Sequence, residues 1–392
     1  MKLSVADVEV KGKKVLLRVD FNVPLEGSRV KDDTRIRATL PTITSLLHRG
    51  ARLILLSHLG RPGGEFRPEL RLDPLAARLS ELLGRAVLKL DQVVGPAVQK
   101  AADELVDGEV LLLENVRFEP GEEKNDPAFA RELAKVADLF VNDAFGTVHR
   151  AHASTAGVAE YIPAVAGLLM IKEIDLLSRC IKQPARPLVA ILGGAKVSDK
   201  LNVIHRFLEL TDTLLIGGGM ANTFLMAMNY PMGNSFFEEG LVDEARKIIE
   251  AGEKSRCCLH LPVDLTVTRE LKPQSDFNIV PVGNVEEGWK AVDIGPETAA
   301  FFEETVASAG TIIWNGPLGV FETAPFHRGT ETVARAVARS RAFSIVGGGD
   351  IVAAIESFGL SEEISFISTG GGATLEFWEG KNLPGIAVLQ ES

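Results

Sequence analysis

Short apolar runs separated by amphipathic stretches recur along the whole chain. In the first half the runs are rich in valine, leucine and isoleucine, and they lie at residues 14–23, 52–60, 109–118 and 138–146. The stretch 72–84, between two of these runs, carries leucines at helical spacing. Near-continuous apolar strands that alternate with helices are typical of a parallel sheet covered on both faces. The pattern therefore predicts an α/β fold.

The second half repeats this plan with glycine at every turn. Five apolar runs lead into glycine and then into a helical stretch, at residues 189–196, 213–224, 311–322, 343–354 and 365–377. The glycines could serve only to make tight turns between strand and helix. In open α/β sheets, however, ligands bind at the carboxyl ends of the strands, where all five turns would gather. This half is therefore a candidate for a ligand site.

The length and one central segment predict two domains. A chain of 392 residues exceeds one ordinary core. Residues 164–187 carry apolar side chains at helical spacing and end in Pro184 and Pro187, which is typical of a helix connecting two lobes. The last residues, 376–392, are too few for a domain and must pack on structure already formed. We therefore expect two three-layer α/β/α domains with parallel sheets, joined by an interdomain helix and hinge, with divisions at 1–167, 168–187 and 188–375.

Composition narrows the classes of function. The formal net charge of −11 argues against a generic nucleic-acid-binding protein, which draws on a basic surface. The first residues contain no apolar stretch suitable for a signal peptide, and the run at 164–171 is too short to span a membrane. Only three cysteines occur, and Cys257 and Cys258 are adjacent, which favours a reducing cytoplasm.

Basic side chains gather at the predicted strand ends of the first half. Four arginines share this position, namely Arg35, Arg61, Arg117 and Arg150. His58 and His152 lie in the same loops, and Asp20 and Asn22 follow the first strand. Arginine grips phosphate or carboxylate with two parallel hydrogen bonds. The sequence thus predicts one pocket for a polyanion.

Ordinary ion pairs remain an alternative for Arg117 and for a further arginine, Arg18. Arg18 could pair with Asp20 on the same face of the first strand. Arg117 could pair with Glu114 or Glu119 at the surface, and such pairs are common and weak.

The stretch VAILGGAKVSDK, residues 189–200, ends in two lysines four residues apart, Lys196 and Lys200. Ser198 is a suitable helix N-cap, which would place Lys200 in the first helical turn, where the helix dipole opposes a cation. A lysine in that position is favourable once an anion shares the site. The stretch fits neither the G-x-x-x-x-G-K-[ST] nor the G-x-G-x-x-G signature, and no spaced Cys/His set for zinc occurs.

Two further glycine turns could bind phosphate through helix N-termini. They read GGGD at 347–350 and TGGGA at 369–373. Asp350 adds a carboxylate that could hold Mg²⁺, or it could be an ordinary N-cap. Glu322 could accept hydrogen bonds from ribose hydroxyls, or it could be a surface carboxylate.

Seven motifs, RVDFNVP, SHLGRP, ENVRF, NDAFGTVHRAHAS, LGGAKVSDK, NGPLGVFE and VGGGD, follow one another over nearly the whole length. In this order they closely resemble the phosphoglycerate kinase family. The resemblance implies two Rossmann-like domains, with 3-phosphoglycerate or 1,3-bisphosphoglycerate held by the first and Mg-ATP or Mg-ADP by the second. It also implies reversible phosphoryl transfer to a carboxylate, domain closure, a monomeric cytoplasmic enzyme, and residues 376–392 packed back on the N-terminal domain.

The resemblance assigns roles residue by residue. The residues implied to bind the glycerate substrate are Asp20, Phe21, Asn22, Arg35, His58, Leu59, Gly60, Arg61, Arg117, Arg150 and His152. Those implied to bind nucleotide are Gly194, Lys200, Gly218, Asn315, Pro317, Glu322, Gly348, Gly349, Asp350 and Ile351. Those implied in catalysis are Arg35, Lys196, Lys200, Gly349 and Gly372. Asp350 would hold the metal, and Arg35 and Lys200 would meet the transferred group from opposite lobes.

The chain departs from the family pattern at Ile351, where the family usually has threonine or serine. A hydroxyl that could touch nucleotide phosphate is therefore missing. Two other functions stay open. One is an acyl-phosphate kinase for another small acid, although such a substrate would not need three arginines. The other is a nucleotide- or polyanion-binding protein without catalysis, although Arg35, Lys196, Lys200 and Asp350 are all retained.

Overall fold

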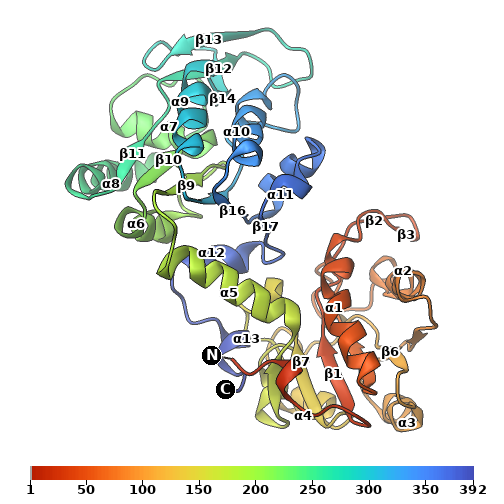
Figure 1. Cartoon of the computed structure of the whole chain (residues 1–392). Coiled ribbons are helices and arrows are strands. Elements are labelled where there is room, and N and C mark those ends of the chain that lie inside the picture. The colour runs from red at the N-terminus through yellow and green to blue at the C-terminus, as the bar shows by residue number, and fades with distance from the viewer. Residues whose placement is uncertain (1) are drawn as a thin grey trace. The chain divides into compact units, whose positions relative to one another are not determined.

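The computed structural model describes residues 2–392, which form two compact units. Unit 1 comprises the chain up to Asp175 together with Lys381–Ser392, and unit 2 comprises Leu176–Gly380. The division falls inside helix α5 (Leu168–Lys182), so this helix contributes residues to both units (Figure 1). The sequence had placed a boundary on either side of this helix. No helix within residues 2–392 is both long and apolar enough to cross a bilayer.

Unit 1 is built on a six-stranded parallel sheet. Its strand order is β5-β6-β4-β1-β7-β8. The strands are β1 (Lys14–Arg18), β4 (Arg52–Leu56), β5 (Leu88–Lys89), β6 (Val110–Leu112), β7 (Leu139–Asn142) and β8 (Ala164–Ala166). A two-stranded hairpin is formed by β2 (Leu25–Glu26) and β3 (Arg29–Val30). The helices confined to this unit are α1 (Thr34–His48), α2 (Asp73–Leu83), α3 (Pro96–Glu104), α4 (Pro127–Ala134) and α13 (Pro384–Ala387).

Both faces of the unit 1 sheet are buried, as the continuous apolar strands predict. Leu17 of β1 packs with Ile43 of α1 and Leu79 of α2 in one core cluster. Leu16 points to the opposite face by strand alternation, and it is also fully buried. The predicted strand 14–23 is shorter than expected, because β1 ends at Arg18. The polar residues that follow it therefore lie in the loop beyond the end of the strand.

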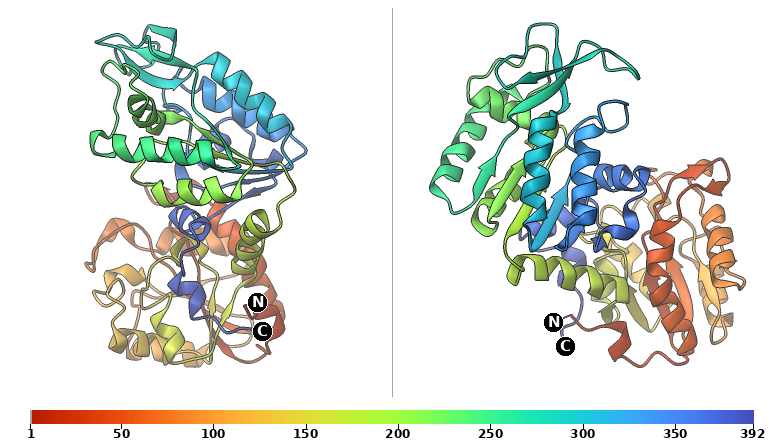
Figure 2. Two further views of the ribbon diagram at one scale, coloured as in Figure 1. Left: turned by 90° about the vertical axis from the view of Figure 1, so that its left-hand side faces the viewer. Right: turned by 45° about the horizontal axis from the view of Figure 1, so that its top comes forward.

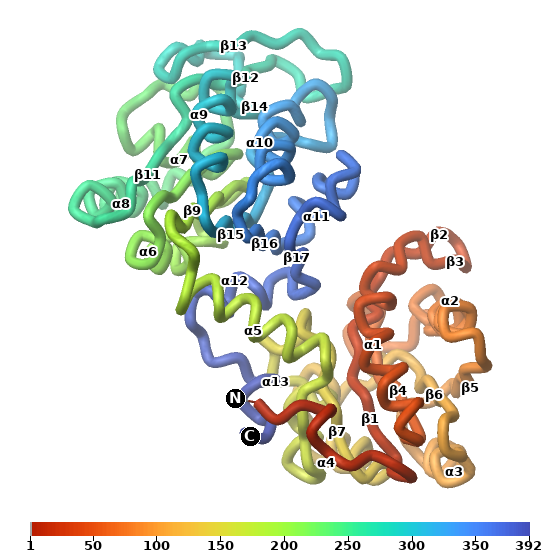
Figure 3. The backbone as a smooth tube through the Cα atoms, in the orientation of Figure 1, coloured from red at the N-terminus to blue at the C-terminus, as the bar shows by residue number. Residues whose placement is uncertain are grey.

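The two ends of the chain lie side by side in unit 1 (Figure 3). The Leu3 amide donates to the Gln390 carbonyl at 2.8 Å, and the Gln390 amide donates to the Ala164 carbonyl at 2.9 Å. Within α13, the Gly385 amide donates to the Val148 carbonyl at 2.9 Å. Backbone hydrogen bonds therefore tie the last residues of the chain to β8 and to the loop after β7.

Unit 2 contains a second six-stranded parallel sheet. Its order is β11-β10-β9-β15-β16-β17. The strands are β9 (Leu188–Leu192), β10 (Thr213–Ile216), β11 (Cys258–His260), β15 (Thr311–Asn315), β16 (Phe343–Val346) and β17 (Phe366–Ile367). Helices cover both faces of this sheet (Figure 2). They are α6 (Leu201–Leu210), α7 (Gly218–Ala227), α8 (Val242–Lys254), α9 (Pro296–Ala307), α10 (Arg328–Arg339), α11 (Gly349–Ser357) and α12 (Gly372–Trp378).

A small antiparallel sheet in unit 2 has no counterpart in the sequence prediction. Its order is β13-β12-β14, from β12 (Asp264–Thr268), β13 (Phe277–Pro281) and β14 (Lys290–Ile294). Asp264 ties it to α9, because its carboxylate accepts from the Thr298 amide at 2.8 Å and from the Glu297 amide at 3.0 Å. Residues 263–272, to which the sequence assigned no role, form the central strand and the turn after it.

The core of unit 2 generates a stability prediction. Phe302 on α9 is fully buried, whereas its neighbour Phe301 is 39% exposed. We expect Phe302→Ala to lower the free energy of unfolding of this unit by about 3–5 kcal/mol, and Phe301→Ala by about 1 kcal/mol or less. All three tryptophans, Trp289, Trp314 and Trp378, lie in unit 2, so denaturation followed by tryptophan fluorescence measures this unit. Equal losses for the two variants would contradict the described packing.

Candidate functional site

In unit 1 the carboxyl ends of neighbouring strands bring the predicted substrate residues together. Asp20 and Asn22 follow β1, His58 follows β4, Arg117 follows β6, and His152 lies in the loop after β7. These strands are adjacent in the sheet, so their loops meet at one edge. The outermost of these residues, Asp20 and His152, are more than a hundred positions apart in the sequence.

Arg35 joins this cluster through Asp20. Its Nη1 lies 2.7 Å from Asp20 Oδ2, and the other oxygen of Asp20 accepts from the Asn22 amide at 3.2 Å. Arg18 forms no ion pair with Asp20, and its side chain bonds to Ser154 and His58 instead. The alternative of an Arg18–Asp20 ion pair is therefore wrong, because Asp20 pairs with Arg35 from α1.

Gly60 is held from both sides by predicted substrate residues. Its amide donates to Asn22 Oδ1 at 2.9 Å, and its carbonyl accepts from Arg117 Nη1 at 2.8 Å. Its φ of +64° favours glycine, and a Cβ would lie 2.8 Å from a Leu70 methyl carbon. Any side chain at this position would disturb the loop that aligns these two residues.

Burial and mutual repulsion perturb the basic groups of this cluster. The pKa of His58 lies well below its usual value, because burial and four nearby arginines, Arg18, Arg117, Arg35 and Arg150, all disfavour its cation. Burial, with Arg18 and Arg150, lowers the pKa of Arg117 to about 10. Burial, followed by Arg117, Arg18 and Arg150, lowers the pKa of His152 to about 4. Both histidines are therefore neutral at pH 7 in a strongly positive environment.

The expected surface ion pairs of Arg117 are wrong. Its Nε lies 3.3 Å from Glu123, while Glu114 bonds to Lys89 instead. Arg117 is only 2% exposed, and its buried Nε makes no hydrogen bond within residues 2–392. A largely buried guanidinium at the carboxyl ends of the strands suits a group that binds an anion.

The remaining predicted substrate residues differ in exposure. Arg61 is exposed and Arg150 is half-buried. Phe21 and Leu59 are buried apolar side chains, so they can offer only backbone groups to a ligand. The Phe21 amide already donates to Ser57 Oγ at 3.0 Å.

In unit 2 three strand ends approach one another closely enough to exclude side chains. The Gly193 amide donates to the Asn315 carbonyl at 2.9 Å, and the Gly194 amide donates to the Pro317 carbonyl at 2.7 Å. A Cβ on Gly193 would lie 2.1 Å from the Pro317 carbonyl oxygen. Gly218 has φ +69°, and its Cβ would lie 2.8 Å from that oxygen. These glycines are required by backbone approach, as well as by the turns.

A cavity of about 360 Å³ lies beside these glycines. Five predicted nucleotide residues line it, namely Gly194, Gly218, Pro317, Glu322 and Asp350. Asn315 is buried nearby and donates to the Gly347 carbonyl. A Cβ on Gly348, which has φ +118°, would lie 2.6 Å from Asn315 Nδ2. The structure thus gathers residues from several separate motifs around one cavity.

Sequence reasoning missed other residues that line this cavity. They include Gly219, Phe236, Leu271, Lys290 and Asp293. Phe236 is 54% exposed and Leu271 is 44% exposed, so both present apolar surface at the cavity. Burial raises the pKa of Asp293 to about 8, although the Gly329 and Ile294 amides donate to it. Most of these residues lie on or near the small antiparallel sheet, for which the sequence carried no recognised motif.

The two lysines of the opening loop have different environments. Lys200 is 9% exposed, and its Nζ donates to the Gly193 carbonyl at 2.8 Å. Burial lowers the pKa of Lys200 to about 8, although Asp199 and Asp350 favour its cation. Lys196 is exposed. The predicted N-cap at Ser198 is wrong: α6 begins at Leu201 with Lys200 as N-cap residue, and the Ser198 hydroxyl donates to Glu238 at 2.6 Å.

Two helices begin at the predicted phosphate-binding glycines. α11 begins at Gly349 and α12 at Gly372. At both positions a Cβ would meet open space and φ is not in the left-handed region, so the fold does not require glycine there. Asp350 is exposed and lies inside α11, so it is not the N-cap, which is Gly348. Ile351 is fully buried in the core, so only its backbone could face a nucleotide.

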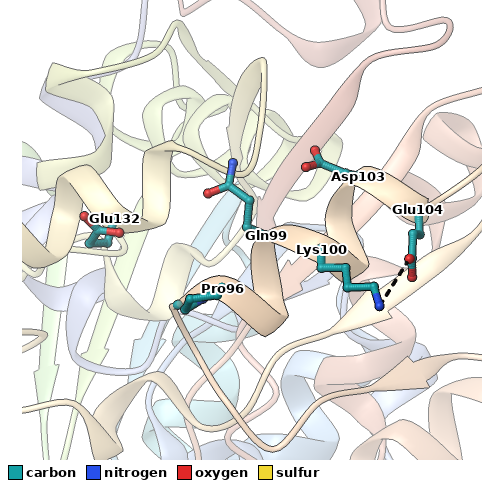
Figure 4. A pocket seen from close by; sticks show the side chains of 7 residues that line it. Pro96, Gln99, Lys100, Asp103, Glu104 and Glu132 are labelled. Carbon is teal, nitrogen blue, oxygen red and sulfur yellow. Dashed lines mark ion pairs between the residues drawn. The ribbon is translucent and has the colours of Figure 1, made fainter.

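Two other hollows lack a comparable arrangement. One lies on unit 1 beside α3 and is lined by charged side chains that do not converge on a common point (Figure 4). There Lys100 pairs with Glu104 at 3.7 Å, and Asp103 pairs with Lys14 at 2.8 Å. The other lies on unit 2 around residues 255–263. No group of three or more His, Cys, Asp or Glu within residues 2–392 is arranged to hold a metal.

The environment of Lys200 predicts a pH-dependent stability. Its pKa falls from 10.5 to about 8 on folding, so the unfolded chain binds more protons between these values. Stability of unit 2 should therefore rise with pH from about 8 to 10.5, by about 3 kcal/mol from this group. Lys200→Met should be more stable than the wild type at pH 7, and this difference should shrink across that window. Tryptophan-monitored denaturation measures it, and a difference independent of pH would contradict the burial of the charge.

Comparison with known proteins identifies the relatives of this chain. The family model described as phosphoglycerate kinase matches residues 5–381. The phosphoglycerate kinases of Moorella thermoacetica and Rubrobacter xylanophilus are each 57% identical over 390 residues, covering 100% of this chain and 99% and 98% of theirs. The solved phosphoglycerate kinase of Coxiella burnetii is similar, with TM-score 0.89 and 42% identity over 99% of this chain and 98% of its own. That of Pyrococcus horikoshii has TM-score 0.87 and 34% identity with the same coverage.

Proposed function

The chain belongs to the phosphoglycerate kinase family, and from this premise we propose which of its residues carry out the reaction. The enzyme transfers a phosphoryl group reversibly between 1,3-bisphosphoglycerate with ADP and 3-phosphoglycerate with ATP, a step of glycolysis and gluconeogenesis. The observation that supports the assignment of the substrate site is the positive cluster at the strand ends of unit 1. Its depressed pKa values indicate cations and donors that lack full compensation by protein carboxylates.

The acceptor chemistry agrees with this inventory. The acceptor of the phosphoryl group is a carboxylate, whose ordinary pKa of about 4 makes it ionised at neutral pH. No general base is needed to activate it. What the reaction needs is alignment and compensation of negative charge on the transferred oxygens. Arginine, lysine and helix N-termini meet that need.

In unit 1 we assign the substrate phosphate to Arg61, Arg117 and Arg150, with His58 and His152 as neutral donors beside them. The assignment of Arg117 is supported by its burial beside Gly60 at the strand ends and by its lowered pKa. Arg35 compensates the charge of the transferred group. Asp20 orients Arg35 through their 2.7 Å contact, and with Asn22 it binds the glycerate end.

In unit 2 we assign the nucleotide to the cavity lined by Gly194, Gly218, Pro317 and Glu322. Glu322 accepts from the ribose, and the N-termini of α11 and α12 donate to phosphate. The open space at Gly349 and Gly372 supports close approach of phosphate oxygens there. Lys200 compensates the transferred group, and the exposed Lys196 contributes charge at the same loop.

The residues present fit a magnesium ion that arrives with the nucleotide. Mg²⁺ usually keeps several waters and is bound by one or two carboxylates and substrate phosphates. Asp350 is one exposed carboxylate in the first turn of α11, and residues 2–392 contain no fuller ligand cluster. Bound there, the ion would neutralise phosphate charge.

Three further proposals concern the whole molecule. Direct transfer requires the two bound substrates to meet, so we infer closure of the domains, and both substrates together should compact the chain more than either alone in small-angle scattering. A monomer is our proposal for the active form. The glycolytic role and three unpaired cysteines support a cytoplasmic location.

Lys200→Ala tests the division of roles. The partner charge of this lysine develops during transfer, so we expect kcat to fall by about 10²–10³ while KM for either substrate changes much less. Steady-state kinetics in both directions measures this split. A rise in KM with kcat unchanged would assign Lys200 to ground-state binding instead.

The substrate assignment is tested by a coupled assay that offers 3-phosphoglycerate, acetate or aspartate with ATP, with and without Mg²⁺. We expect turnover only with 3-phosphoglycerate, and a large loss of it when Mg²⁺ is chelated. Activity on acetate and aspartate alone would overturn the assignment. Turnover that survives chelation would overturn the role of Asp350 and the metal.

A further inference from the structure

A continuous chain of buried hydrogen bonds underlies the substrate cluster of unit 1. Glu122, Ser154 and Arg18 are each 0% exposed, and His58 is 3% exposed. Ser154 Oγ lies 2.6 Å from Glu122 Oε1, and Arg18 Nε lies 2.9 Å from the same Ser154 Oγ. Arg18 Nη2 lies 3.1 Å from His58 Nδ1. None of the seven motifs gave Glu122, Ser154 or Arg18 a role.

The guanidinium determines the direction of every bond in this chain. An arginine can only donate, so Ser154 Oγ accepts from Arg18 and its own proton must go to Glu122 Oε1. The Ser154 amide also donates to Glu122 Oε2 at 2.9 Å, so both carboxylate oxygens act as acceptors. At the other end His58 Nδ1 must accept, which leaves the imidazole proton on Nε2.

Arg18 has no freedom to turn away from these partners. Its Nη1 donates to the Val19 carbonyl, so all three nitrogens of the guanidinium are engaged. His58 Nε2, by contrast, makes no hydrogen bond within residues 2–392. It is also not one of the unbonded polar atoms that are shut off from solvent. One face of the imidazole is thus fixed by Arg18, and the other can reach a ligand.

We propose that Arg18 is a positioning residue, held by Glu122 through Ser154, which locks His58 as a neutral Nε2–H donor to the bound glycerate substrate. The proposal rests on the substrate site proposed for unit 1. It goes beyond that site because it specifies which atom of His58 donates, and because it gives three buried residues a role in preparing that donor. A second proton on His58 would have to sit on Nδ1, which faces Arg18 Nη2 at 3.1 Å, although Asp20 Oδ1 lies 3.9 Å from the same nitrogen.

A neutral donor has a specific advantage in this cluster. Four arginines already disfavour a histidine cation. A charged His58 would therefore add to the repulsion among the positive groups when no substrate is bound. A neutral Nε2–H adds a hydrogen bond to the substrate without adding charge. Its protonation state should also stay constant over the range in which an ordinary histidine titrates, about pH 5–8.

The first test is the protonation of His58 in the intact wild-type enzyme. Long-range ¹H–¹⁵N spectra of protein labelled at histidine distinguish the two neutral tautomers from the cation, and His58→Gln assigns the signal among seven histidines. We expect the Nε2–H tautomer, unchanged between about pH 6 and 8. Observation of the Nδ1–H tautomer, or of the cation at pH 7, would overturn the proposal.

The second test removes the arginine. Arg18→Met keeps the length of the side chain without its donors, and Ser154→Ala removes only the support of the guanidinium. We expect Arg18→Met to give a mixture of tautomers and to raise KM for 3-phosphoglycerate roughly ten- to hundred-fold. Ser154→Ala should change both in the same direction by less. KM for ATP should stay within about two-fold in both variants.

Arg52→Met is the matched control. Arg52 begins β4 at the opposite end of the sheet and pairs with Asp107 at 2.9 Å, so neither the tautomer nor KM should change. An unchanged tautomer in Arg18→Met would refute the lock, and a changed tautomer with unchanged KM would refute the role in substrate binding. If the wild type failed to turn over 3-phosphoglycerate, the substrate site would fall, while the spectra would still decide the tautomer.

Discussion

Positive charge held out of water without matching carboxylates is the constraint on which both halves of this enzyme depend. Unit 1 buries Arg18, Arg117 and two neutral histidines near one sheet edge, and unit 2 buries Lys200 against a backbone carbonyl. Burial is the leading cause of the lowered pKa values of all these groups. Each unit therefore gives up some stability to keep donors partly desolvated. A phosphate or carboxylate ligand can restore that loss, because it supplies the charge that the protein withholds.

The carboxylates inside the unit 1 cluster orient the arginine side chains without neutralising the positive charge of the site. Glu122 reaches Arg18 only through Ser154, and Asp20 takes one nitrogen of Arg35. Glu123 lies near one side of Arg117 at 3.3 Å, and the side chain's Nη1 is used to hold Gly60. Direct bidentate pairing would have neutralised these arginines. Contacts through single atoms leave part of the Arg35 and Arg117 guanidinium groups available, whereas all three nitrogens of Arg18 are engaged.

Backbone approach explains why the nucleotide half needs so much glycine. The loops after β9, β10 and β15 meet through amide–carbonyl bonds, and a Cβ on Gly193 or Gly218 would collide with the Pro317 carbonyl. Gly349 and Gly372 are different, because the fold leaves room for a side chain at both. The nucleotide phosphate proposed to approach the helix N-termini would explain glycine at those two positions. The same residue type therefore has two separate physical reasons in one unit.

The local sequence pattern was sufficient to predict the parallel sheets, the helix α5 between the two units and the order of the loops. It was sufficient because apolar period, glycine and proline act over a few residues, and because parallel strands place their carboxyl ends on one edge. The sequence also singled out Arg117, Lys200 and Asp350 as charged groups in turns that follow apolar strands. Arg35, expected at a strand end, lies instead in the first turn of α1. Their roles as site residues stay a proposal.

Tertiary structure decided what the local pattern could not. Arg18 contacts His58, from the loop after β4, and Ser154, from the loop after β7, so its role depends on contacts 40 and 136 residues away. Ser198 is not the N-cap that the sequence predicts, because its hydroxyl donates a hydrogen bond to Glu238, which is distant in the sequence. The small antiparallel sheet brought Lys290 and Asp293 to the cavity without any motif. The sequence by itself determined which chemical groups stand at which strand ends. Which of them are paired, buried or left free was decided only by long-range packing, because hydrogen-bond partners and desolvation depend on distance in space.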